Sequence, residues 1–262
     1  MSGAKAHRRS RRNLWNFKST SRPEVSPKHV GFIAQAVSTA PYRRAPGLRH
    51  LLRIPDMTST SLAQQERKTL CDLLVERGAG APTLCEGWVT SDLAAHLVVR
   101  ERRPDSGPGL VWPPLARYTD KVRRSVRDRW SWDELVETVR RGPPWLLRPF
   151  DGPMNTVEYF IHVEDVRRAQ DGWEPRAISP ELADALWARV GPGGMAKRVP
   201  ATIVMMSPGR ADKQSGTGPR LILAGDPGEL TMFGAGRQGA ARVEISGDAT
   251  LAAKLRDAPL GI

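Results

Sequence analysis

Two histidines and one glutamate have the residue types and the spacing that a metal site requires. The chain has five histidines, and only His96 and His162 lie beyond residue 56. Glu158 precedes His162 by four residues, so a helix would place both side chains on one face. Two imidazoles and one carboxylate leave a coordination position open, which is the composition of a catalytic zinc centre. The three residues are therefore a candidate divalent-metal site between facing helices.

The spacing of these residues does not by itself exclude roles that involve no metal. Glu158 follows Asn155 by three residues, so it could complete a capping box at the start of a helix. A single histidine on an amphipathic helix is usually a packed or surface residue. A glutamate and a histidine four residues apart also recur by chance, because so short a motif has little specificity.

The elements that must position these residues follow from periodicity and capping signals. Apolar spacing and cap residues predict helices over 58–78, 90–103, 115–128, 131–141, 156–170, 179–190 and 248–256. Short apolar runs separated by Gly, Pro and Asp predict strands over 201–206, 220–224, 229–233 and 241–245. The order predicts an α+β chain in which a bundle of about four main helices precedes a small α/β unit.

The charge distribution argues against a nucleic-acid partner. The formal net charge is +12, but residues 1–56 hold 12 Lys/Arg and two acidic residues, a net of +10, which leaves +2 for the remaining chain. A field that attracts phosphate would therefore have to come from the N-terminal segment alone. No apolar stretch approaches the roughly 20 residues of a membrane span, so no membrane partner is expected either. Two cysteines, Cys71 and Cys85, exclude a disulfide scaffold and a cysteine-based zinc cluster.

Residues 1–56 are predicted to be a disordered basic tail, because they combine low hydrophobicity with charge of one sign. Residues 10–14, SRRNL, resemble a twin-arginine export signal, but charged residues and a proline follow where an apolar region is needed. A transit peptide would share the Arg and Ser bias. Composition changes at Met57, so we favour an upstream start artefact, with a genuine flexible extension as the alternative.

Removal of residues 1–56 is expected to leave the folded unit intact. A chain that begins at Met57 should keep the thermal midpoint of the full chain, because the removed segment has no periodicity with which to join a core. Circular dichroism during heating measures this midpoint. Loss of cooperative unfolding in the shorter chain would contradict the prediction.

Two segments resemble mycothiol-dependent maleylpyruvate isomerase-like proteins of the DinB-like metal-binding superfamily. Residues 84–97, LCEGWVTSDLAAHL, resemble the family segment in which a tryptophan precedes a capped helix with the first metal histidine. Residues 154–165, MNTVEYFIHVED, resemble its second motif, a Glu and a His four apart on the last bundle helix. Residues 96–105, HLVVRERRPD, are most similar to an actinobacterial metal-binding branch. The resemblance covers about residues 60–175.

The resemblance implies a fold and a set of ligands. It implies a DinB-like four-helix bundle over 57–198 that binds a divalent metal, with zinc expected, through His96, Glu158 and His162. Residues 236–237 and 243–248 resemble the sterol-carrier-like α/β domain that often follows such a bundle, here 199–262. The family supplies an arginine from this domain to the cleft, and Arg237 is the candidate for that catalytic role. A solvated loop arginine is the alternative.

The resemblance also implies a cytoplasmic enzyme that acts on a small-molecule substrate with a low-molecular-weight thiol, mycothiol, as cosubstrate. The metal would activate the thiol for an isomerase or transferase reaction. The alternative is a non-enzymatic binding protein with a structural or vestigial metal and an α/β domain that holds an apolar ligand.

Four further predictions concern residues near the candidate site. Trp88 is expected to pack at the start of its helix, and Cys85 to be a small buried residue. Asp165 could orient the His162 imidazole or pair with Arg168 at the surface. The basic cluster over 100–103 is expected to be a solvated last turn of a helix.

Overall fold

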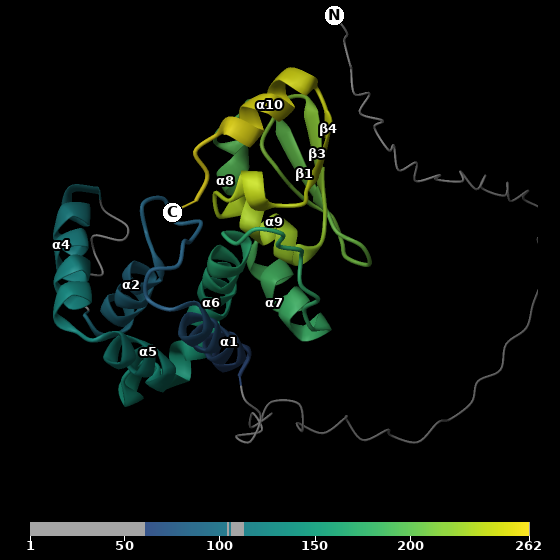
Figure 1. The fold of residues 1–262 in the computed structure, drawn as a ribbon. Helices are drawn as coiled ribbons and strands as arrows, with labels where there is room; N and C mark the ends of the chain where they lie inside the picture. The colour runs from purple at the N-terminus through teal and green to yellow at the C-terminus, as the bar shows by residue number, and fades with distance from the viewer. Residues whose placement is uncertain (1–60, 104, 106–112, 262) are drawn as a thin grey trace, which may run out of the picture. The chain divides into compact units, whose positions relative to one another are not determined.

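The computed structural model describes residues 61–103, 105 and 113–261 (Figure 1). The disorder predicted for 1–56 lies outside these residues. The described helices are α1 (Leu62–Arg77), α2 (Thr90–Arg102), α4 (Pro113–Arg129), α5 (Trp132–Arg141), η2 (Trp145–Phe150), α6 (Asp151–Arg168), α7 (Pro180–Arg189), α8 (Gly193–Ala196), α9 (Pro227–Gly234), η3 (Gln238–Ala240) and α10 (Ala249–Asp257). The strands are β1 (Thr202–Met206), β2 (Lys213–Ser215), β3 (Arg220–Ala224) and β4 (Glu244–Gly247).

Side-chain caps define the starts of several helices, as the sequence predicts. The Ser61 hydroxyl accepts a hydrogen bond from the Gln64 amide at α1, and Ser131 does the same for Glu134 at α5. In both helices the third residue bonds back to the cap, which completes a capping box. Ser179 caps α7, where proline occupies the first turn.

Five helices, α1, α2, α4, α5 and α6, enclose one hydrophobic core. Leu70 of α1, Leu97 of α2 and Tyr159 of α6 are fully buried in it. Burying side chains of this size contributes roughly 1.5–3 kcal/mol each. Both α2 and α6 contribute side chains to this core, and these two helices carry the candidate metal residues.

The strands form one mixed sheet in the order β2-β1-β3-β4. The β1 and β3 strands are parallel, while β2 and β4 are antiparallel to their neighbours. Ile203 of β1 and Leu223 of β3 are fully buried in the core that this sheet shares with Trp187 of α7 and Met195 of α8. A smaller cluster joins α6, α7 and α9 through Phe160, Leu186 and Met232. Helices α7 and α9, which also contribute to the core of the sheet, therefore contact the helical bundle through α6.

Three predicted elements differ from the structure. The strand predicted over 229–233 is helix α9. The helix predicted to start at 156 with Asn155 as its cap starts at Asp151, so Asn155 is an internal residue of α6. The short strand β2 was not predicted at all, and the strand expected over 241–245 is found at Glu244–Gly247. The assignment to a DinB-like bundle and a sterol-carrier-like domain, with its boundary at 198/199, remains a prediction.

Among the described helices, none combines the length and the apolar character that a bilayer crossing demands.

Candidate active site

The structure brings His96, Glu158 and His162 together. Oε1 of Glu158 lies 3.4 Å from Nε2 of His96 and 3.2 Å from Nε2 of His162. The two imidazole rings meet edge to face, with centroids 5.5 Å apart. His96 comes from α2, whereas Glu158 and His162 lie one turn apart on α6. Three potential ligand atoms from two helices thus surround one point.

Local structure fixes the start of α2 and therefore the position of His96. The Thr90 hydroxyl donates to the Gly78 carbonyl, which ties the start of α2 to the end of α1. Asp92 accepts from the Val89 amide, satisfying one of the free donors at the helix start. Trp88 packs against the bundle core and its ring centroid lies 5.2 Å from that of His96. Trp88 therefore packs at the start of its helix, as predicted, and also contacts the site.

The three side chains differ in their preference for a proton. Burial by itself would raise the pKa of Glu158, but hydrogen bonds from His162 and His96 outweigh it and hold that pKa well below its usual range. Burial lowers the pKa of His96, and the hydrogen bond to Glu158 only partly offsets it. Burial would also lower the pKa of His162, but Asp165, Cys85 and Glu158 together raise it well above the ordinary value. Glu158 is thus ionised and ready to act as an anionic ligand.

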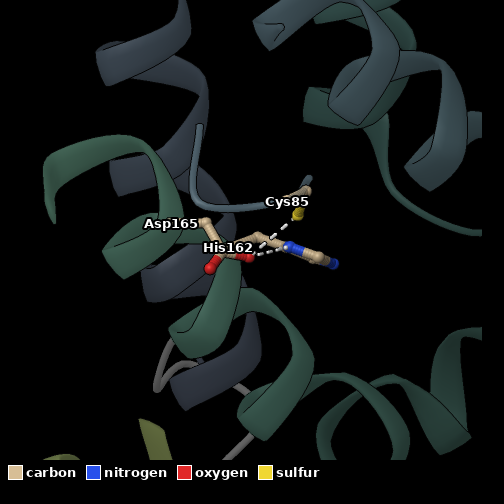
Figure 2. Close-up of side chains that lie close together, drawn as sticks. All are labelled: Cys85, His162 and Asp165. Atoms are coloured by element: carbon tan, nitrogen blue, oxygen red, sulfur yellow. Dashed lines mark hydrogen bonds and ion pairs between the residues drawn. The ribbon is translucent and has the colours of Figure 1, made fainter. Parts of the chain in front are cut away.

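The other ring nitrogen of His162 has its own partner. Nδ1 of His162 lies 2.9 Å from Oδ2 of Asp165, one turn further along α6, as Figure 2 shows. Asp165 is fully buried. Burial would raise the pKa of Asp165, but hydrogen bonds from His162 and Arg237 lower it to about 2. A carboxylate on the outer nitrogen of a metal-binding histidine fixes the ring and its tautomer. Of the two predicted roles of Asp165, the structure shows this one, and Arg168 pairs instead with Glu164 and Glu229.

Arg237 reaches the same carboxylate from the end of α9. Its Nε and Nη2 lie 2.8 Å from Oδ1 and Oδ2 of Asp165, which is a bidentate ion pair. The preceding residue, Gly236, has φ +87°, and a Cβ there would lie 2.5 Å from the Leu260 carbonyl oxygen. The Gly236 amide donates to Phe233 and the Arg237 amide to Met232, which is the Schellman pattern of a helix end. Glycine is therefore required at 236 to place Arg237.

Two groups of potential ligands share His162, and they differ in their suitability for a cation. One is His96, Glu158 and His162; the other is Cys85, His162 and Asp165. In the second group the Arg237 guanidinium bonds to both oxygens of Asp165 at 2.8 Å, whereas in the first group the Arg100 guanidinium lies further from Glu158, at 3.3 Å. The nearer positive charge opposes a metal ion more strongly. Zinc bonds of 2.0–2.1 Å in a tetrahedron set ligands about 3.3 Å apart. The 3.2 and 3.4 Å separations in the first group match this spacing. The residues present therefore fit a zinc-sized ion at the first group.

A cavity of about 530 Å³ opens onto this group. Its wall includes Cys85, Trp88, Arg100 and Arg237 beside the three candidate ligands. Nε of Arg100 lies 3.3 Å from Oε1 of Glu158. Two guanidinium groups thus lie at the cavity wall, and each contacts a carboxylate: Arg100 contacts Glu158, and Arg237 contacts Asp165.

The prediction that residues 100–103 form a solvated helix end is wrong for two of them. Arg100 lines the cavity, and Glu101 is buried and paired with Arg67. The position of Arg100 at the cavity could have been predicted from the sequence. Arg100 follows His96 by four residues, so both side chains share one face of the helix. Cys85 is only partly buried, and its Sγ lies 3.2 Å from Oδ2 of Asp165.

The two cysteines should differ in their reactivity toward an alkylating reagent. Cys71 is fully buried, and burial raises the pKa of its thiol to about 11, so it stays neutral and inaccessible near neutral pH. Cys85 lines the cavity. Iodoacetamide applied to the native protein should label Cys85 and spare Cys71, as read by peptide mass spectrometry. Unfolding in urea should expose both, and equal labelling of both in the native protein would contradict the described burial.

No protein-family model matches the sequence, and no curated protein matches it. Two solved structures are similar to the chain, both crystal structures of mycothiol-dependent maleylpyruvate isomerase and one of them of a mutant. They share 15% and 16% sequence identity with it, at TM-scores of 0.48 and 0.46. Each match covers 71% of this chain and 90% of the solved chain.

Proposed function

We propose that this protein is a metal-dependent enzyme that uses a low-molecular-weight thiol, of the mycothiol type, to isomerise or conjugate a small electrophilic substrate. One observation carries the proposal: two imidazoles and a carboxylate converge on one point at the wall of a cavity of about 530 Å³. The motifs around His96 and His162 that resemble the mycothiol-dependent isomerases support the choice of a thiol.

Each residue of the site has a distinct part. His96, Glu158 and His162 would hold the divalent ion, which supplies the positive charge that favours a thiolate over a thiol near neutral pH. Asp165 holds Nδ1 of His162, so that Nε2 faces the cavity. The ring of Trp88 supports His96 from the cavity wall.

The substrate would be an anion with an electron-poor double bond or another electrophilic carbon. Arg100 at the cavity wall and the bound divalent ion would supply the positive charge for such an anion. Addition of a thiolate to a cis double bond leaves a single bond that can rotate. Elimination of the same thiolate then restores the double bond in the trans form, so the thiol is regenerated. In a transferase the thiolate would instead stay attached to the product: a proton would neutralise the carbanion after addition, or a leaving group such as chloride would depart after substitution.

The test is a reaction assay on the full chain reconstituted with Zn²⁺. Maleylpyruvate and a chromogenic electrophile, 1-chloro-2,4-dinitrobenzene, are each supplied with and without mycothiol. Consumption of maleylpyruvate with constant free thiol indicates an isomerase. A product that forms as free thiol is lost indicates a transferase. Both rates should require the thiol and should fall on treatment with a chelator.

The Glu158→Gln variant, compared with the parent protein, tests whether the two rates depend on the candidate ligand. It keeps the size of the side chain and removes the negative charge that balances the ion, so both rates should fall with it. Stoichiometric zinc binding without any thiol-dependent turnover would favour the alternative, a binding protein with a structural metal. Absence of zinc binding would overturn both functions.

A further inference from the structure

We infer that Arg237 is a positioning residue, which holds His162 in its metal-binding orientation through Asp165 and does not grip the substrate. The inference rests on the proposed metal site and concerns how the site is kept in shape. It also changes the role that the sequence gives to this arginine, from direct catalysis to support of a ligand.

The hydrogen bonds of the guanidinium argue for this role. Nε and Nη2 both bond to Asp165 at 2.8 Å, and Nη1 donates to the Ala235 carbonyl at 2.5 Å. Nη2 also lies 3.5 Å from Sγ of Cys85. A guanidinium has five N–H groups in a fixed planar arrangement. Because most of them are directed at the protein, little of the guanidinium is left for a substrate anion.

Asp165 needs this partner because its side chain is fully buried. A buried carboxylate is costly unless charge and hydrogen bonds compensate it. Arg237 supplies the positive charge and occupies both oxygens, which fixes the plane of the carboxylate. Oδ2 is then held at 2.9 Å from Nδ1 of His162. Without Arg237 the carboxylate would be free to rotate toward another donor, and the imidazole would lose its support.

The ion pair between Arg237 and Asp165 joins two elements that are remote in sequence. Arg237 follows α9, 72 residues after Asp165 on α6. A second ion pair joins α6 to α9: Nη2 of Arg168 lies 2.7 Å from Oε1 of Glu229. Glu229 accepts hydrogen bonds from the Arg168 guanidinium and the Arg242 amide, which belong to neither His162 nor Asp165. Glu229 therefore provides a control for any loss of packing between the same two helices.

The test measures zinc affinity by competition with a chromophoric chelator, on the full chain. Arg237→Gln should weaken Zn²⁺ binding about tenfold or more, and Asp165→Asn should do so within the 10–100-fold range that is typical of groups supporting metal ligands. Arg237→Lys keeps the charge but loses the two-point contact, so its effect should be smaller. Glu229→Gln should leave the affinity within about twofold of the parent, since distant groups do not couple.

A double-mutant cycle tests whether Arg237 acts through Asp165. In an Asp165→Asn background the carboxylate charge is gone, so Arg237→Gln should change zinc affinity by less than about twofold. The same background protects against misfolding, because it leaves no unpaired buried carboxylate. The visible spectrum of the Co²⁺-loaded Arg237→Gln protein should also shift, since a rotated imidazole changes the ligand field.

The outcomes separate this inference from the proposed function. If the parent binds zinc and Arg237→Gln binds it equally well, the positioning role is wrong and the metal site stands. A full loss caused by Arg237→Gln in the Asp165→Asn background would show that Arg237 acts by another route. A comparable loss with Glu229→Gln would reduce the effect to helix packing. A parent that binds no zinc overturns the site and the inference together.

Discussion

Replacement of His162 by alanine is expected to abolish stoichiometric binding of Zn²⁺. The change removes one of three protein ligands and leaves His96 and Glu158, too few to hold the ion against water. It also frees Asp165 from its histidine partner. Metal analysis after dialysis against a weak chelator should give about one zinc per parent chain, as a single three-ligand site implies, and almost none per variant chain.

A matched control is available within the chain. His29→Ala removes a histidine from the N-terminal segment, far in sequence from the candidate ligands, and should leave the stoichiometry unchanged. His96→Ala should reproduce the loss seen with His162→Ala. Full zinc occupancy in both ligand variants would exclude the site and the thiol chemistry that depends on it.

Replacement of Arg67 by methionine should have the largest effect on stability. Nη1 of Arg67 lies 2.7 Å from Oε1 of Glu101, and Nη2 lies 2.5 Å from Oδ1 of Asp151. All three side chains are nearly inaccessible, and Tyr159 also bonds to both Arg67 and Glu101. Removal of the only cation of this group would leave two buried carboxylates without a counter-charge. The free energy of unfolding should fall by about 3–5 kcal/mol.

Urea denaturation followed by circular dichroism measures this change at constant pH. Lys68→Met provides the control, because Lys68 is the next residue of α1 and pairs with Asp72 at the exposed surface. An exposed pair contributes about 0–1 kcal/mol, so the control should shift the midpoint little. Equal shifts in the two variants would show that the buried group contributes no more than a surface pair.

Local sequence determined most helix limits and the candidate ligands. Ser61, Ser131 and Ser179 begin their helices because a hydroxyl satisfies an amide that the first turn leaves unpaired. The four-residue spacing of Glu158 and His162 fixes their shared face wherever the segment is helical. These effects act within a few residues, so the sequence alone was sufficient to predict them.

Burial obscured the signals of two elements. All residues of α9 from Pro227 to Phe233 are buried, so its apolar side chains do not follow a period of 3.6 residues and the segment resembles a strand. The cap Asp226 followed by Pro227 was the available sign of a helix start. The predicted start of α6 was too late because Asn155 was interpreted as a cap, whereas the helix begins at Asp151 and accommodates a proline in its first turn. Asn155 bonds to Asp151 and Glu101 inside the bundle instead of capping.

Only the tertiary structure decided which groups surround the candidate metal ligands. Arg237 and Cys85 are 72 and 80 residues from Asp165, and no local pattern specifies that they meet its carboxylate. Their contacts depend on how α9 and the loop before α2 pack against α6, where the Leu84 amide donates to the Asp165 carbonyl. Sequence spacing thus determined that Glu158 and His162 share one helix face, because helix geometry is local. Packing determined the buried charges that orient them, because a buried carboxylate is stable only where the fold brings it a partner.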